Sequence, residues 1–256
     1  MIDTHTHLYH SSFPDGGKEV VMRALEAGVK HMVLPNTDKE SIQPILDLHK
    51  AFPKATSIAM GLHPTDLDEN WEETLDMMEK LLEENKDFVA VGEVGIDLYW
   101  DKSNLENQKR AFARQLKIAS RLNLPVIIHC REALDETISV IKEVNPAVPL
   151  IFHSFTGGIK EVEKIRNVCD PWFGINGVVT YKNAENLREA LPVIGLERIV
   201  LETDSPYLTP VPHRGKKNES AYLPYILSQV AKSLGKGEDE VEKITEDNAV
   251  KIFNIS

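Results

Sequence analysis

Cysteine is scarce in this sequence: only two occur among 256 residues, Cys130 and Cys169. Two cysteines make no disulfide framework, so we expect both to be reduced, buried, small hydrophobic side chains in a reducing compartment. No apolar run approaches the roughly 20 residues that span a bilayer, and strand-like sequence begins at once, without a charged and apolar signal segment. We therefore expect a soluble, cytoplasmic protein with no membrane partner.

Basic residues are also in short supply. The chain has 29 lysines and arginines against 40 aspartates and glutamates, which gives a formal net charge of −11. Proteins that grip nucleic acid through many phosphates normally present a basic surface, so this charge argues against tight, nonspecific coating of duplexes. It says less about a small site in which metal ions neutralise a phosphate.

Several nucleotide-binding and catalytic motifs are missing. No G-x-G-x-x-G or P-loop follows an apolar run, which disfavours the alternative of an open doubly wound sheet. No G-x-S-x-G is present, and hence no nucleophile elbow. Cys130 directly follows His129, but neighbours on a strand face opposite sides, so the two do not form a nucleophilic couple by adjacency.

The sequence does contain a regular alternation of short apolar runs and longer amphipathic stretches. The apolar runs predict buried parallel strands near residues 1–7, 31–36, 56–63, 88–95, 125–130, 149–154, 172–179 and 198–204. The amphipathic stretches predict helices near 18–28, 39–51, 71–85, 104–122, 133–144, 158–167, 184–190, 220–234 and 238–253. Because parallel strands require crossovers, eight strand–helix units give an α/β fold, the (β/α)8 TIM barrel. The length suits one such barrel and no linker is visible, so we expect a single domain over residues 1–256.

Six side chains that commonly bind metals close five of the predicted strands. They are His5, His7, Glu93, His129, His153 and Asp204. In a TIM barrel the functional residues gather at the carboxyl ends of the strands, so these side chains are expected to converge on one site. His5 and His7 are alternate residues of the first predicted strand, which places both imidazoles on the same side, within reach of one metal.

The carboxylates in and around this set differ in their expected roles. Glu93 lies inside an apolar strand, where a charge is costly unless it is paired or bound to metal. Its two oxygens suit a bridge between two cations, and a buried ion pair with an arginine is the alternative. Asp204 suits metal binding, proton acceptance from water, or both. Asp3 and Glu202 are expected to orient ligands or to be structural. Asp97 is a further candidate ligand, but its position beyond the strand end favours a loop or capping role.

Four imidazoles and two carboxylates exceed the ligands of one tetrahedral ion. They suit two divalent cations about 3.5–4 Å apart, with a bridging hydroxide as the nucleophile. The nitrogen-rich set favours zinc, or manganese in a mixed environment, because magnesium sites usually contain fewer histidines. The number of ions bound stays open.

Two further groups are candidates for contact with substrate. His63 ends the third predicted strand and faces the same mouth, where substrate contact and a structural role are equally reasonable. The segment Pro212-His-Arg-Gly-Lys-Lys-Asn-Glu219 is the one concentrated basic loop, and it follows Asp204 closely. Charge runs are usually solvated surface, but this location makes Arg214 and Lys216 candidates for phosphate contact.

In these segments the chain resembles the TatD family of metal-dependent deoxyribonucleases, within the amidohydrolase-like barrels. The resemblance runs through Ile2-Asp-Thr-His-Thr-His7, Gly61-Leu-His-Pro64, Gly92-Glu-Val-Gly-Ile-Asp97, Pro125-Val-Ile-Ile-His-Cys-Arg131, His153-Ser-Phe-Thr-Gly157, Glu202-Thr-Asp-Ser-Pro206 and Arg214-Gly-Lys-Lys-Asn-Glu219. It implies a two-metal site made of the six residues above, with Glu93 bridging. It also implies hydrolysis of phosphodiester bonds in DNA, from single-stranded or 3′ ends.

The chain departs from the family pattern at three positions. Tyr9 stands where the family often has aspartate or asparagine, Thr65 replaces a histidine, and Ser220 replaces a proline. None of these changes removes a proposed metal ligand. They put substrate preference, rather than hydrolytic chemistry, in question.

The leading hypothesis is metal-dependent hydrolysis of DNA phosphodiesters, with Glu93 and Asp204 acting in catalysis. The acidic surface then predicts modest affinity and a substrate that enters by an end or a frayed strand. A small-molecule amidohydrolase or esterase with the same metal centre is the alternative, because barrels host many chemistries. A non-catalytic nucleic-acid-binding or scaffolding protein is a third, which the intact ligand set disfavours. A monomer is the default expectation.

Overall fold

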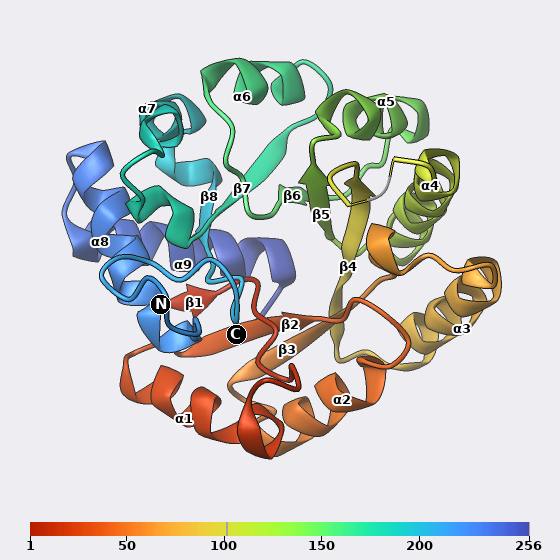
Figure 1. The fold of residues 1–256 in the computed structure, drawn as a ribbon, viewed down its shortest axis with the longest axis horizontal. Helices are drawn as coiled ribbons and strands as arrows, with labels where there is room; N and C mark the ends of the chain where they lie inside the picture. Colours follow the sequence, from red (N-terminus) through yellow and green to blue (C-terminus); the bar gives the residue numbers. More distant parts are fainter. Residues whose placement is uncertain (101, 256) are drawn as a thin grey trace.

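Eight parallel strands form a ring that is surrounded by helices (Figure 1). The computed structural model describes residues 1–100 and 102–255. Within these residues the strands pair in chain order, and they are β1 (Ile2–Asp3), β2 (His31–Pro35), β3 (Thr56–Met60), β4 (Phe88–Asp97), β5 (Val126–Arg131), β6 (Leu150–Phe152), β7 (Pro171–Ile175) and β8 (Ile199–Leu201). The ring closes where the backbone N–H of Thr4 donates to the carbonyl of Leu201, 3.0 Å away. The predicted TIM barrel is confirmed.

The interior of the ring is a packed core. One apolar cluster takes a single residue from each strand and adds side chains of the last helix: Ile2, Val33, Ala59, Ala90, Ile127, Ile151, Trp172, Val200, Ala249, Ile252, Phe253 and Ile255. This last helix, α9 (Glu238–Phe253), packs against β1 and β8. Its apolar residues therefore close the amino-terminal end of the barrel, and the carboxyl ends of the strands form the open mouth.

The remaining helices form the outer layer (Figure 1). They are α1 (Lys18–Glu26), α2 (Ile42–Ala51), α3 (Trp71–Glu84), α4 (Leu105–Leu122), α5 (Leu134–Val144), α6 (Ile159–Arg166), α7 (Glu185–Ile194) and α8 (Leu223–Leu234). Each buries an apolar stripe against the outward side chains of the strands. The helix predicted over 104–122 ends at Leu122 because Asn123 adopts a left-handed conformation, with φ 54°. The helix predicted from residue 39 begins three residues later, after Ser41.

Several strands are shorter than their apolar runs predicted. The predicted strand over residues 1–7 ends at Asp3, and the strands predicted to residues 154, 179 and 204 end at Phe152, Ile175 and Leu201. At β1 the physical reason is visible, because the Asp3 carboxylate accepts hydrogen bonds from the backbone N–H groups of His5 and Thr203. These bonds replace ladder bonds with a local turn. His5 and His7 therefore lie in the loop beyond β1, where strand alternation does not fix their spacing.

Two structural observations concern the predicted absence of a membrane span and the predicted state of the cysteines. In the described part of the chain, no helix combines the length and the apolar character that a membrane crossing needs. Cys130 and Cys169 are both free, and each is half-buried rather than fully buried as predicted.

Gly95 is expected to be indispensable to the β4–β5 pairing. It lies opposite His129 in the parallel ladder, and a Cβ built there would lie 1.9 Å from the His129 carbonyl oxygen. Replacement Gly95→Ala should therefore lower the free energy of unfolding by about 3 kcal/mol, measured by urea denaturation. Gly237→Ala is the matched control, since its Cβ meets no atom within 4 Å. A loss of about 0.5 kcal/mol is expected there, and equal losses in both variants would contradict the close approach.

Candidate metal centre

The six predicted ligands converge at the mouth of the barrel. Glu93 lies within β4 and His129 within β5, whereas His5, His7, His153 and Asp204 lie in the loops just beyond β1, β6 and β8. All of them except His5 line a cavity of about 800 Å³, and His5 is fully buried beneath it. Residues from five strands of the chain therefore meet within one concave site.

One oxygen of Glu93 faces a first group of ligands. Glu93 Oε2 lies 3.2 Å from His5 Nε2 and 3.5 Å from His7 Nε2, and these two nitrogens are 3.1 Å apart. Asp204 Oδ1 completes the group, 3.7 Å from His5 Nε2 and 3.6 Å from His7 Nε2. Ligands bound tetrahedrally to zinc at 2.0–2.1 Å are roughly 3.3 Å apart. The group therefore has the spacing of a metal shell.

The other oxygen of Glu93 faces a second group. Glu93 Oε1 lies 2.7 Å from His129 Nδ1 and 2.8 Å from His153 Nε2, and the two nitrogens are 3.4 Å apart. Glu93 thus presents one oxygen to each group of imidazoles. Its polar contacts within residues 1–100 and 102–255 include no arginine, so the alternative of a buried Glu–Arg pair is wrong for this carboxylate.

Two of the imidazoles have a hydrogen-bond partner on the side that faces away from the cluster. The Tyr9 hydroxyl donates to the Pro35 carbonyl, 2.6 Å away, and accepts from His7 Nδ1 at 2.9 Å. The Asp97 carboxylate accepts from His129 Nε2 at 2.9 Å. A proton on the outer nitrogen of each ring leaves the lone pair of the inner nitrogen for a cation in the cluster. Against burial, Tyr9 raises the pKa of His7 well above its ordinary value, and Asp97 raises the pKa of His129. Such partners behind a metal-binding histidine fix the ring and raise its basicity.

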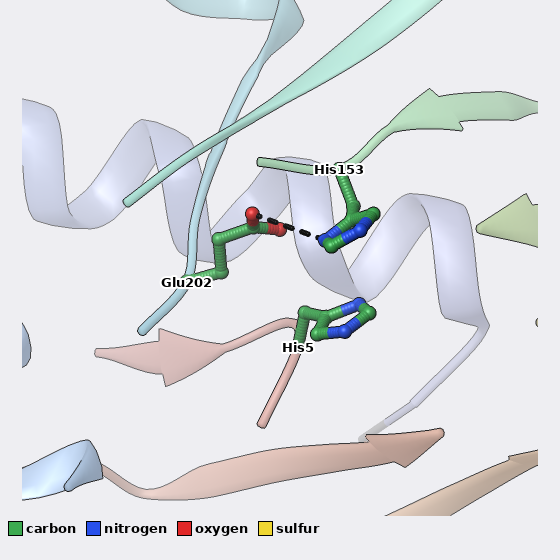
Figure 2. A group of neighbouring side chains, drawn as sticks. All are labelled: His5, His153 and Glu202. Carbon is green, nitrogen blue, oxygen red and sulfur yellow. Dashed lines mark ion pairs between the residues drawn. The ribbon is translucent and has the colours of Figure 1, made fainter. Parts of the chain in front are cut away.

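His153 has a carboxylate behind it as well. Figure 2 shows the rings of His5 and His153 lying one above the other, with the Glu202 side chain directed at His153. Glu202 Oε1 lies 3.7 Å from His153 Nδ1 and also accepts from the backbone N–H of Ser154. Gly174 makes room for this carboxylate, because a Cβ there would lie 2.1 Å from Glu202 Oε2. Glu202 therefore backs the site, as the sequence predicted, whereas Asp3 bonds no imidazole and is structural.

The electrostatics of the cluster favour a cation. Burial raises the pKa of Glu93, but the imidazoles of His153, His5 and His63 outweigh burial and hold that pKa well below its ordinary value. Burial lowers the pKa of His153, yet Glu93 and Glu202 raise it well above the ordinary value. A buried ionised carboxylate among nitrogen lone pairs is a donor set that divalent cations fit, and because a cation and a proton compete for each lone pair, binding releases protons.

Comparison with known proteins identifies the family. The sequence matches the family described as TatD related DNase over residues 2–254. The chain belongs to the TatD related DNase family. It is 35% identical to YabD, a metal-dependent hydrolase of Bacillus subtilis, over the full length of both chains. It is 34% identical to the 3′-5′ ssDNA/RNA exonuclease TatD of Pantoea ananatis, again over both full lengths. The crystal structure of YjjV, a TatD homologue from Escherichia coli, superposes with a TM-score of 0.91 at 28% identity, covering 100% of this chain and 98% of that one.

His63 enters the centre of this TatD family member from β3. Its Nδ1 accepts a hydrogen bond from the backbone N–H of Thr65, so the neutral ring carries its proton on Nε2. Nε2 lies 3.4 Å from Glu93 Oε1. Burial, aided by His129, lowers the pKa of His63, which keeps the ring neutral. A protonated Nε2 can donate a hydrogen bond to a substrate, and substrate contact stays a prediction for His63. Together with Glu93 and His129, His63 also has the spacing of a metal-binding group.

The basic loop lies apart from the centre. Arg214 stacks over the ring of Tyr181, 4.0 Å from its centroid, and Lys216 is exposed. Neither lines the 800 Å³ cavity. The contact of these two residues with phosphate remains a prediction, and it applies to a longer strand rather than to the scissile group.

Sequence reasoning missed several residues of the cavity wall. Trp100, Arg131 and Tyr207 all line the cavity. Asp97 was expected in a loop or a cap. It does accept from the backbone N–H groups of Tyr99 and Trp100, and it also accepts from His129. Their position could have identified two of these residues, because Asp97 and Arg131 are the last residues of β4 and β5, at the mouth of the barrel.

Removal of metal is expected to lower thermal stability. A cation that binds the folded chain at about 1,000 times its dissociation constant contributes roughly 4 kcal/mol, or a shift of about 10 °C for a domain of this size. Chelator-treated protein should recover that shift on addition of Zn²⁺ or Mn²⁺ in differential scanning fluorimetry. Elemental analysis should find two ions per chain in the wild type and fewer in His129→Ala. His49→Ala, outside the cluster, should keep both ions, and a chelator-insensitive Tm would count against the site.

Tyr9 is expected to raise the metal affinity of the first ligand group through its hydrogen bond with His7. Tyr9→Phe keeps the ring but removes the oxygen that accepts from His7 Nδ1. Loss of such a partner typically weakens metal affinity 10- to 100-fold, which competition with a fluorescent chelator will measure. Tyr225→Phe on α8 is the control, because Tyr225 lies outside the cavity. Unchanged affinity in Tyr9→Phe would refute the role.

Proposed function

We propose that this chain is a metal-dependent exonuclease that hydrolyses phosphodiester bonds at the 3′ ends of single-stranded DNA or RNA. The observation that carries the proposal is the placement of Glu93, with one oxygen in each of two groups of ligands. The full-length likeness to a 3′-5′ ssDNA/RNA exonuclease supplies the substrate class.

The donor set is suited to two divalent cations. His5, His7 and Asp204 would hold one ion, His129 and His153 would hold the other, and Glu93 would be shared by both. Zinc or manganese suits these nitrogen-rich groups better than magnesium. When bound, the pair of ions supplies Lewis acidity to the phosphate and an activated water as nucleophile.

The protein's own groups then have distinct tasks. Asp204 lines the cavity, and despite burial its neighbour His7 lowers its pKa, so the carboxylate is ionised and can accept a proton from water. His63 presents Nε2–H on the opposite side of Glu93 and can donate to a phosphate oxygen. Asp97 and Tyr9 keep His129 and His7 oriented throughout.

The net charge of the protein and the shape of the cavity favour the terminus of a single strand as substrate. A net charge of −11 gives the molecule no broad attraction for a duplex. The cavity is concave and closed beneath by the packed barrel interior, so a strand terminus enters it more readily than a continuous helix. We also propose that the protein works in the cytoplasm, where its two free cysteines stay reduced.

Hydrolysis of end-labelled single-stranded DNA and RNA tests the function. With Mn²⁺, Zn²⁺ or Mg²⁺ the wild type should shorten strands from the 3′ end, and chelator should abolish the ladder. His129→Ala should lose about 10³-fold in kcat/KM, because several kcal/mol of transition-state stabilisation is removed, with an unchanged circular dichroism spectrum. His49→Ala controls for contaminating nuclease and should remain active. Turnover of a lactone or amide, with no cleavage of nucleic acid under any metal, would replace the nuclease with a small-molecule hydrolase.

A further inference from the structure

An exposed tryptophan stands at the rim of the metal cavity. Of the three tryptophans in the chain, Trp71 and Trp172 are 6% and 5% exposed, whereas Trp100 is 68% exposed. Trp100 lies three residues beyond the end of β4 and lines the same cavity as Glu93 and His129. A large apolar ring left in water beside a catalytic cleft is suited to stack on a flat partner.

Arg131 provides a cation beside this ring. Its guanidinium lies over the ring of Tyr99, 3.8 Å from the centroid, and 5.6 Å from the centroid of Trp100. The rings of Tyr99 and Trp100 meet edge to face at 4.9 Å. Within the described residues Arg131 makes no ion pair, and it is the one arginine or lysine that lines the cavity. The aspartates and the glutamate of the lining are carboxylates. Arg131 is therefore the permanently positive side chain of the lining that can bind a phosphate.

Asp97 connects this rim to the metal centre. One of its carboxylate oxygens accepts from the backbone N–H groups of Tyr99 and Trp100, at 2.9 and 3.1 Å, and the other accepts from His129 Nε2. Arg131 lies two residues after His129 on β5, so the two side chains leave the same side of the strand. The aromatic rim is therefore fixed at the edge of the second ligand group.

We propose that Trp100 and Arg131 form a nucleotide-binding subsite beside the metal centre, in which the indole stacks on a nucleobase and the guanidinium binds the adjoining phosphate. The subsite rests on the proposed function, since it receives the nucleotide next to the scissile phosphate. Stacking accepts any base, because every base has a π-face, and an arginine that already lies against an aromatic ring keeps its N–H groups for phosphate. The subsite therefore selects single-stranded nucleic acid over small esters without selecting sequence.

Intrinsic fluorescence tests the stacking. Metal-loaded wild type is titrated with a phosphorothioate-linked dT10, which resists cleavage, and with a matched strand of abasic deoxyribose phosphates. Because the other two tryptophans are buried, stacking on Trp100 should give a saturable quench with dT10 and none with the abasic strand. Binding of dT10 without a quench would overturn the stacking and place the base elsewhere, for example on Tyr207.

Variants separate stacking from folding. By anisotropy of labelled dT10, Trp100→Ala should bind roughly tenfold more weakly, in the range expected for one stacked base, while Trp100→Phe keeps most of the affinity. Both should bind the abasic strand as the wild type does. Tyr225→Ala, an exposed aromatic outside the cavity, should bind dT10 normally. Equal affinity of Trp100→Ala and wild type would overturn the subsite while leaving the exonuclease standing.

Salt dependence tests the arginine. Arg131→Gln should reduce the slope of log affinity against log salt by about 0.7, the value for one phosphate contact on a single strand. Lys80→Gln, an exposed lysine on α3, should leave the slope unchanged. An unchanged slope in Arg131→Gln would overturn the phosphate contact. Failure of the wild type to bind or cleave any strand would instead overturn the proposed function, and the subsite with it.

Discussion

A single buried carboxylate, Glu93, is the constraint around which the rest of the site is arranged. Its two oxygens face two groups of imidazoles, and it is 4% exposed. A charge so deeply buried costs several kcal/mol unless it is compensated, and the described structure offers it histidines rather than arginine or lysine. The compensating histidines lie in β5 or just beyond β1, β3 and β6. Closure of the whole barrel is therefore a condition for the site, and the site contributes to the stability of the closed barrel once cations are bound.

Much of this could be predicted from the sequence because two independent signals coincide. Apolar runs mark strands, and a histidine or carboxylate at the end of such a run has a chemistry that a core position rarely explains. Strand ends were less predictable, since β1 stops where the Asp3 side chain takes over backbone bonds that the ladder would otherwise use. The partners behind the imidazoles and the exposure of Trp100 were beyond reach, because they depend on which loops meet after the chain has closed on itself.

The three departures from the family pattern share one chemical property. Tyr9, Thr65 and Ser220 each bring a hydroxyl to a group in or under the centre: His7, His63 and the buried Asp3, respectively. The family often has aspartate or asparagine at this position, and a neutral phenol behind His7 withholds the negative charge by which an aspartate would make the imidazole a stronger donor. Under the proposed two-ion centre, the ion beside His7 would then remain more electron-poor and would be the better Lewis acid. The departures thus bear on metal electronics and on the tautomer of His63, in addition to the substrate preference that the sequence raised.

The helix α9 closes the amino-terminal end of the barrel with Ile252 and Phe253. This closure determines how substrate and product can enter and leave the cavity. The catalytic cleft has a single opening, so a molecule that enters by the mouth of the barrel must also leave by it. If the chain is the proposed exonuclease, a strand cannot pass through the barrel during cleavage. It must withdraw or move sideways so that the released nucleotide can leave past the remaining polymer. On that proposal, product release would limit turnover, and free nucleotides would compete with the next strand end for the single entrance.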